Sequence, residues 1–223
     1  MSYRKIPIVK GEIYHVFNRS IAKQPIFMSN KDYQRAIEVF KYYQFAKPPL
    51  RFSFYYRLQK DQKVKFIEEL LKSANSIVDI LCFCLMPNHF HFLLKNLKDS
   101  GINKFMSNFQ NSYAKYFNTK TGRTGSLFQQ NFKAVRVESD EQLTHVSRYI
   151  HLNPITAYLI NSVEELIDYP WSSYPEYISK GKSNLNKDLV LGNFRSINDY
   201  KKFVADQVDY QRELDKIKHI ILE

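Results

Sequence analysis

Two histidines with one residue between them lie near the middle of the chain. They are His89 and His91, in the run PNHFHFLLK at residues 87–95. If this run is a strand, its side chains alternate between faces, so both imidazoles share one face and Phe90 and Phe92 share the other. The rise along a strand separates the two histidines by roughly 6.5–7 Å, and rings that lean together from this spacing can hold one metal ion. The alternative is a pair of surface histidines on a half-buried strand.

A polar row on a later segment supplies a possible nucleophile. His145, Tyr149 and Asn153 are spaced by four residues, so on a helix they lie one above another. A tyrosine beside polar groups can attack phosphorus as its phenolate, against an unperturbed pKa of about 10, and a metal ion would help by polarising and orienting the phosphate. The alternative is that Tyr149, one of 16 tyrosines, is a packing or interfacial aromatic.

These two segments belong to a longer series of motifs that resembles a known family. The series consists of YHVFNR at 14–19, MPNHFHFLL at 86–94, GSLFQ at 125–129 with FK at 132–133, and YIHLNP at 149–154. In this order and spacing it resembles the single-tyrosine HUH transposases, in particular the REP-associated tyrosine transposases and the "transposase 17" domain proteins. The resemblance covers about residues 10–170, and four ordered motifs are far more specific than any one of them.

The resemblance implies a role for each of three residues. Tyr149 matches the nucleophile that attacks a DNA phosphate, forms a 5′-phosphotyrosine link and releases a 3′-hydroxyl. A later 3′-hydroxyl can reverse that step, so cutting and rejoining need no ATP. His89 and His91 match the metal ligands of the family.

The residues leave two candidates for a third metal ligand. Asn153 matches the position where relatives place one, and its amide oxygen favours Mg²⁺ or Mn²⁺. It also precedes Pro154, which disfavours helical geometry, so its role could be to end the helix. His145, one turn before Tyr149, is the alternative ligand. His151 points away from Tyr149, and we expect it to be structural or to contact DNA.

The charge balance favours a polyanionic partner. Lys plus Arg outnumber Asp plus Glu by 33 to 22, which suits nucleic acid or an anionic membrane surface. Single strands are held by basic grooves with aromatic stacking, and relatives act at hairpin ends, so we expect single-stranded DNA that carries a hairpin. Each candidate DNA contact could equally be a solvated surface charge; the candidates are Arg19, Lys23, Lys115, Lys120, Arg123, Lys133 and Arg136.

Other expectations concern location and competing functions. No stretch approaches the roughly 20 apolar residues of a membrane span and the first residues lack an apolar signal region, so we expect a cytoplasmic protein. A non-catalytic nucleic-acid-binding protein of the same fold is the main alternative. A small-molecule metallohydrolase would instead need a deep apolar pocket beside the histidines. A homodimer is possible, because some relatives share the tyrosine-bearing helix between subunits while others act alone.

The elements that must position these residues follow from hydrophobic periodicity and turn signals. We expect strands at 12–18, 77–86, 89–95 and 127–137, and helices at 30–46, at 101–118 and from Ser139 or Asp140 to about 152, where Pro154 ends the last one. The nearly all-apolar run 77–86 suits a central strand buried on both faces. Cys82 and Cys84 within it are expected to be small buried residues.

This element order predicts an α+β fold. Strands interleaved with helices, with one tight hairpin, indicate a ferredoxin-like (split βαβ) antiparallel sheet with helices on one face. Residues 47–75 are interpreted as an insertion, with an irregular or strand segment at 51–58 and a helix at 62–73. We expect a catalytic domain at 1–170 and a mostly helical C-terminal extension at 171–223, with a helix at about 197–215.

Overall fold

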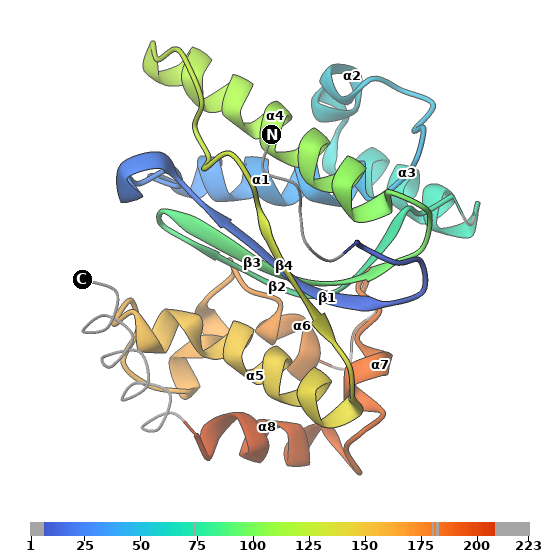
Figure 1. Cartoon of the computed structure of the whole chain (residues 1–223), viewed down its shortest axis with the longest axis vertical. Helices are drawn as coiled ribbons and strands as arrows, with labels where there is room; N and C mark the ends of the chain where they lie inside the picture. Colours follow the sequence, from blue (N-terminus) through green and yellow to red (C-terminus); the bar gives the residue numbers. More distant parts are fainter. Residues whose placement is uncertain (1–6, 74, 180, 182, 208–223) are drawn as a thin grey trace.

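The computed structural model describes residues 7–73, 75–179, 181 and 183–207. Four strands form one antiparallel sheet with the order β2-β3-β1-β4. The strands are β1 (Ile13–Arg19), β2 (Val78–Met86), β3 (His89–Asn96) and β4 (Lys133–Val137). Figure 1 shows them crossing the middle of the molecule.

The first helical layer completes the predicted ferredoxin-like order. Helices α1 (Asn30–Tyr43) and α4 (Gly101–Thr121) follow β1 and β3 in the chain and cover the same face of the sheet. Aromatic rings fill the space between them and the sheet, with Phe40 of α1 and Phe109 of α4 each packing against Phe92 of β3. The α+β class and the ferredoxin-like topology are therefore confirmed.

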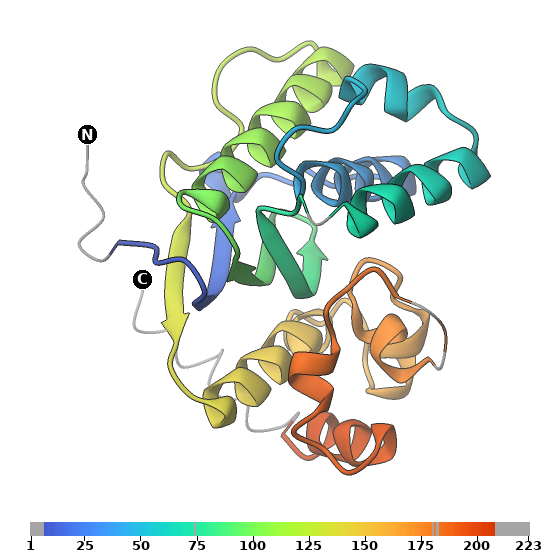
Figure 2. The same ribbon diagram turned by 90° about the vertical axis from the view of Figure 1, so that its right-hand side faces the viewer.

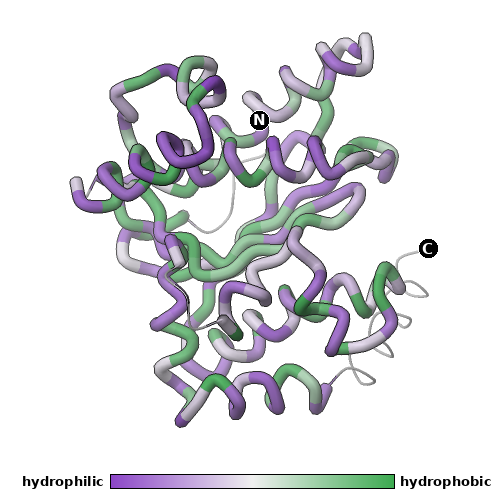
Figure 3. Tube along the Cα trace, turned by 180° about the vertical axis from the view of Figure 1, so that it is seen from behind, coloured by the Kyte–Doolittle hydropathy of each residue, from purple (hydrophilic) through white to green (hydrophobic). Residues whose placement is uncertain are grey.

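Helices cover both faces of the sheet, so the expectation that they lie on one face is wrong. The second layer contains α5 (Asp140–Thr156), η2 (Glu164–Asp168), α6 (Tyr174–Ile178), α7 (Asp188–Leu191) and α8 (Ile197–Ala205). The physical reason is that β2 and β3 are apolar on both sides: Leu93 and Cys84 pack against α5, whereas Phe92 and Phe83 pack against α1 and α4. Figure 2 shows the two layers above and below the sheet, and Figure 3 shows the hydrophobic strands between them.

Strand β2 is buried on both faces, as predicted, but it is an edge strand and not a central one. Its outer edge bonds to a later segment instead of a fifth strand. The amide of Leu85 donates to the carbonyl of Trp171 (2.8 Å), and the amide of Ser173 donates to the carbonyl of Phe83 (2.9 Å). The segment before α6 therefore satisfies backbone groups that an open edge would leave to solvent.

The predicted insertion is helical throughout. Helix α2 (Phe52–Arg57) replaces the irregular or strand segment expected at 51–58, and α3 (Lys60–Lys72) extends the expected helix at 62–73. The helical turn buries Phe52 and Tyr55 against Tyr42 of α1. Because residues three apart share a helix face, this aromatic spacing favours a helix over a strand.

Three smaller boundaries also differ from the sequence prediction. The strand expected at 127–137 is limited to β4, and Pro154 lies inside α5 instead of ending it. Asn153 explains how the helix passes the proline: its side-chain amide donates to the carbonyls of Tyr149 (2.8 Å) and Ile150 (3.5 Å), the latter being the acceptor that Pro154 cannot reach. Helix α8 ends at Ala205, and residues 208–215 of the predicted last helix lie outside the described residues.

Two further expectations can be compared with the structure. Cys82 and Cys84 are buried free thiols in the layer that faces α5, as predicted. Among the described helices, none is long and apolar enough to cross a bilayer.

Candidate active site

Strand β3 presents its histidines as the alternation predicts. Phe90 and Phe92 point into the core under α1 and α4, so His89 and His91 lie on the opposite face, beneath α5. Their ring centroids are 5.1 Å apart, and the rings are nearly perpendicular. His91 is 5% exposed, so this pair sits at the sheet and not in open solvent.

Helix α5 brings Tyr149 to these histidines within one chain. The Tyr149 ring meets the His91 ring edge to face, with centroids 5.6 Å apart. Ser139 is the N-cap of α5, and its hydroxyl accepts a hydrogen bond from the amide of Gln142 (3.2 Å). The buried stripe of α5, which includes Ile150, packs on the same sheet face and sets the rotation that turns Tyr149 toward β3.

A third histidine, His15 of β1, completes the cluster and was missed as a site residue. Its Nε2 lies 2.9 Å from Nδ1 of His91, and the two rings stack with centroids 5.2 Å apart. The His15 ring is also 5.7 Å from that of Tyr149. The signal was present in the strand YHVFNR, because alternation puts His15 on the face opposite the buried Tyr14. What the sequence lacked was the register, in which His15 pairs with Leu93 and Phe17 with His91.

His89 is held as a neutral ring with a defined tautomer. Burial, together with the positive charge of Arg19, lowers the pKa of His89 to about 4. Its Nδ1 lies 2.6 Å from the side-chain oxygen of Asn88, which can only accept, so Nδ1 carries the proton. The lone pair of His89 is therefore on Nε2, which is the atom that a metal ion would use.

The donor set near Tyr149 suits a hard divalent ion that keeps several water ligands. Within the described part of the chain, no group of three or more His, Cys, Asp or Glu residues could hold a metal ion. The available donors are thus the two β3 imidazoles and an amide oxygen on α5. Mg²⁺ and Mn²⁺ commonly bind through few protein ligands, completing their shell with water and substrate phosphate.

The two candidates for the third ligand differ in their contacts. Asn153 is 6% exposed, and its amide nitrogen donates to the backbone of its own helix, which leaves the amide oxygen as a possible metal ligand. His145 instead accepts a hydrogen bond from Nη2 of Arg148 (2.8 Å) at Nδ1 and packs its ring on Phe203 of α8. His145 is thus engaged with Arg148 and Phe203, whereas Asn153 keeps its amide oxygen out of the contacts with its own helix.

Comparison with known proteins agrees with the fold of this chain. A family model described as "Transposase IS200 like" matches residues 51–153. Residues 51–153 are thus similar to IS200-like transposases. The matched segment runs from α2 into α5 and contains His89, His91, Tyr149 and Asn153, whereas β1 and His15 precede it.

A solved structure extends the comparison over most of the chain. It is titled "Structure of the REP associates tyrosine transposase bound to a REP hairpin". The match has a TM-score of 0.51 at 16% sequence identity and covers 81% of this chain and 87% of that one. At this identity the match shows a shared fold. No curated protein sequence matches the chain.

His151 of the matched segment is structural, and its burial excludes direct contact with DNA. It is 0% exposed, with Nδ1 2.7 Å from the Tyr200 hydroxyl and Nε2 2.7 Å from the Ser173 hydroxyl. Burial lowers its pKa to about 3. His151 thus joins α5 to α8 and to the segment that covers the edge of β2.

Two of the predicted DNA contacts lie beside the histidine–tyrosine cluster. Arg19 ends β1 opposite His89, and its charge acts on that ring. Lys133 of β4 pairs with Phe17 in the sheet, with Nζ 5.9 Å from the Phe17 ring. Because Phe17 stacks on His91 at 5.5 Å, both cations border the proposed reaction site.

The other five predicted contacts are not part of this cluster. Lys23 follows β1, where its carbonyl accepts a hydrogen bond from Asn88. Arg123 bonds to Asn118 at the end of α4. Lys115 and Lys120 lie on α4, across the sheet from Tyr149, and Lys120 pairs with Asp32 at 2.6 Å. Arg136 pairs with Glu12 at 2.9 Å, and its strand position points it to the α4 side.

Proposed function

We propose that this protein cleaves and rejoins single-stranded DNA carrying a hairpin, through a 5′-phosphotyrosine intermediate on Tyr149. The observation that carries the proposal is the contact of the Tyr149 ring with His91 and His15, beside the neutral His89. A tyrosine that serves only in packing would have no reason to meet two imidazoles beside a third. The related structure bound to a REP hairpin supports a hairpin substrate.

In the proposed reaction Tyr149 exchanges one phosphodiester bond for another. Its phenolic oxygen bonds to phosphorus while the bond from phosphorus to the 3′-oxygen breaks. The phenol loses its proton, and the departing 3′-oxygen gains one, so the products are a 5′-phosphotyrosine and a free 3′-hydroxyl. A 3′-hydroxyl that later attacks the same phosphorus restores Tyr149 and joins the strand.

Nε2 of His89, Nε2 of His91 and the amide oxygen of Asn153 are the atoms we propose to hold a Mg²⁺ or Mn²⁺ ion. Such an ion, when bound, polarises the scissile phosphate and orients it for in-line attack. His15 sets the tautomer of His91: when the shared proton is on Nδ1 of His91, its Nε2 keeps a lone pair. Arg19 and Lys133 hold the phosphates on either side.

A second candidate is a DNA-binding protein of the same fold without turnover. The observation that favours it is that the described residues offer no group of three His, Cys, Asp or Glu ligands for a metal. A binder needs the basic groove but has no need of Tyr149. The two candidates therefore differ in whether a covalent product forms.

The test is to incubate the full-length protein with a library of labelled single-stranded hairpins and Mn²⁺, then denature it and look for labelled protein. We expect a covalent adduct that disappears in Tyr149→Phe and in the presence of EDTA. Tyr158→Phe, which alters an exposed tyrosine just beyond α5, is the matched control and should keep the adduct. Hairpin binding without an adduct in any condition would favour the non-catalytic candidate.

A further inference from the structure

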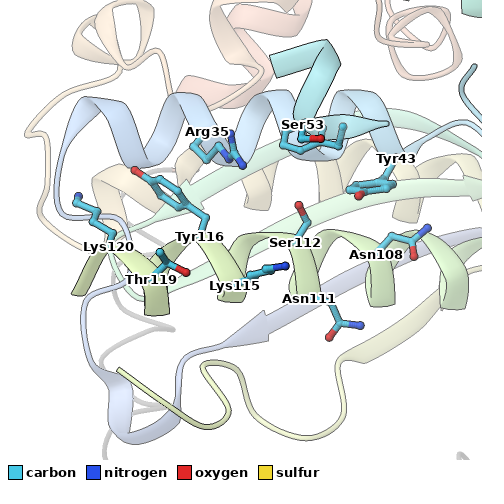
Figure 4. A pocket seen from close by; sticks show the side chains of 11 residues that line it. Arg35, Tyr43, Ser53, Asn108, Asn111, Ser112, Lys115, Tyr116, Thr119 and Lys120 are labelled. Carbon is cyan, nitrogen blue, oxygen red and sulfur yellow. The ribbon is translucent and has the colours of Figure 1, made fainter. Parts of the chain in front are cut away.

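A second candidate site lies on the face of the sheet away from Tyr149. A pocket of about 700 Å³ opens between α1, α2 and α4 (Figure 4). Its lining consists of three cations, three aromatic rings and five residues with amide or hydroxyl groups: Arg35, Lys115, Lys120, Tyr43, Phe52, Tyr116, Ser53, Asn108, Asn111, Ser112 and Thr119. A volume of this size is within the range of small-ligand sites.

Arg35 is fixed in this pocket by aromatic rings and not by a carboxylate. Its guanidinium carbon lies 4.0 Å from the Tyr56 ring centroid, 4.6 Å from that of Phe52 and 5.1 Å from that of Tyr116. Its Nε is buried without a hydrogen-bond partner, and among the described residues no acid forms an ion pair with it. Aromatic stacking thus holds Arg35 in place while donors of its planar fork remain available for an anion.

The surrounding charges leave the pocket positive. None of its lining residues is acidic. Asp32, which contacts two of the lining residues, is buried and accepts hydrogen bonds from Lys120 and from the Tyr116 hydroxyl, at 2.6 and 2.8 Å. In the described part of the chain, no acid forms an ion pair with Arg35 or Lys115. An anionic ligand is expected, because cations held in a partly buried site attract one strongly.

We propose that this pocket binds one unpaired nucleotide of a DNA strand. The cations Arg35 and Lys115 would contact its phosphate, the aromatic wall would contact its base, and Asn108 and Asn111 would reach the base edge. A phosphate alone would leave most of the volume and the rings unused, whereas single-stranded nucleic acid is recognised by cations together with aromatic faces. The choice of DNA as ligand rests on the proposed function; the pocket itself does not depend on Tyr149.

Basic residues connect the two faces around one end of the sheet. Arg19 is the last residue of β1, and Lys23 follows it in η1 (Ile21–Lys23). Lys120 lies in the last turn of α4, and Arg123 comes just after that helix. Figure 1 shows these two ends on the same side of the molecule, beside the β2–β3 turn. One strand of DNA could therefore reach both the pocket and Tyr149 by passing this end.

The test measures binding without cleavage. Full-length Tyr149→Phe protein in EDTA is titrated against a fluorescein-labelled short single strand, by anisotropy. We expect Lys115→Gln to weaken binding roughly fivefold and Arg35→Gln roughly tenfold, with a smaller salt dependence in both. Lys104→Gln, which alters an exposed lysine on the same helix outside the pocket, is the control and should bind like the parent. Parental affinity in Lys115→Gln, whose exposed side chain has no packing role, would overturn the proposal.

Competition between the labelled strand and small ligands identifies the class of ligand that the pocket binds. Deoxyadenosine monophosphate should displace the strand at concentrations at which inorganic phosphate does not. Equal displacement by both would show a simple anion site and overturn the nucleotide assignment. Binding in the pocket does not require Tyr149. A protein that forms the covalent adduct but binds no nucleotide in the pocket would therefore reject this inference alone. Pocket binding without any adduct in the wild-type protein would reject only the proposed reaction.

Discussion

His15 and His91 come from neighbouring strands and share a hydrogen bond of 2.9 Å between Nε2 of His15 and Nδ1 of His91. A single proton lies between these nitrogens, so the tautomer of one ring fixes the tautomer of the other. If His15 accepts this hydrogen bond, the proton is on Nδ1 of His91, and its Nε2 carries the lone pair that a metal ion would use. Residues that orient a metal-binding histidine in this way usually affect affinity nearly as strongly as ligands do.

Replacing His15 should therefore change metal affinity without a change of ligand. We expect His15→Phe to lower Mn²⁺ affinity about 10- to 100-fold, measured by titration with detection of free Mn²⁺ by electron paramagnetic resonance. His15→Gln is the matched variant, because its side-chain oxygen can still accept from Nδ1 of His91, and it should retain most of the affinity. Equal affinity in wild type and His15→Phe would show that His15 does not position His91.

The third ligand can be assigned by comparing substitutions on α5. Asn153→Ala should lower Mn²⁺ affinity roughly tenfold, since it removes the proposed oxygen donor. Asn153→Asp should retain affinity, because it keeps an oxygen at the same position. His145→Ala should also retain it, since that ring contacts Arg148 and Phe203. The reverse pattern, with loss only in His145→Ala, would make His145 the ligand.

Two basic residues of β4 should differ in their effect on DNA binding. Lys133 faces Phe17 next to the histidine cluster, whereas Arg136 is paired with Glu12. We expect Lys133→Gln to weaken single-strand binding and to reduce the slope of log affinity against log salt by about 0.7. Arg136→Gln should leave both unchanged. Similar losses in the two variants, measured by anisotropy at several salt concentrations, would contradict a groove centred on Tyr149.

Buried neutral histidines should make stability depend on pH. The pKa values of His89 and His151 are about 4 and about 3, below the ordinary 6.5 of an unfolded chain. As the pH falls from 6.5 toward 4, these two histidines therefore bind protons in the unfolded state but stay neutral in the folded state. The free energy of unfolding decreases as a result. We expect the free energy of unfolding in urea to drop on the order of 2–4 kcal/mol between pH 7 and pH 4.5.

The variant His151→Gln tests the source of that pH dependence. It should be less stable than wild type at pH 7, because the hydroxyls of Tyr200 and Ser173 lose their ring partner. Its free energy of unfolding should also fall less steeply below pH 6.5, because Gln does not bind a proton in the unfolded state as His151 does. An unchanged slope would mean that His151 already carries a proton in the folded protein.

The parts of the site that depend on local periodicity were predictable from the sequence. Alternation along 89–95 placed His89 and His91 on one face, and four-residue spacing placed Tyr149 above Asn153 on α5. The ordered motifs led to the family that the model for residues 51–153 matches. The antiparallel ferredoxin-like topology followed from the order of elements, because short connections and one hairpin leave few alternatives.

Other features were decided by contacts between distant segments. His15 could be placed on a face but not beside His91, because the pairing of β1 with β3 joins residues far apart in the chain. The helices on the second face could not be foreseen either, since burial of β2 on both sides does not say which segment covers each. Similarly, Lys120 was a free cation in the sequence until the fold brought Asp32 to it.

The sequence by itself determined which residues can bind metal, attack phosphorus or attract DNA, because those properties belong to side chains and their local spacing. Only the tertiary structure decided that Tyr149 meets the histidines within one chain, and that Arg35 stands among three rings across the sheet. The physical reason is that strand register and layer packing are set by the burial of apolar faces over the whole domain.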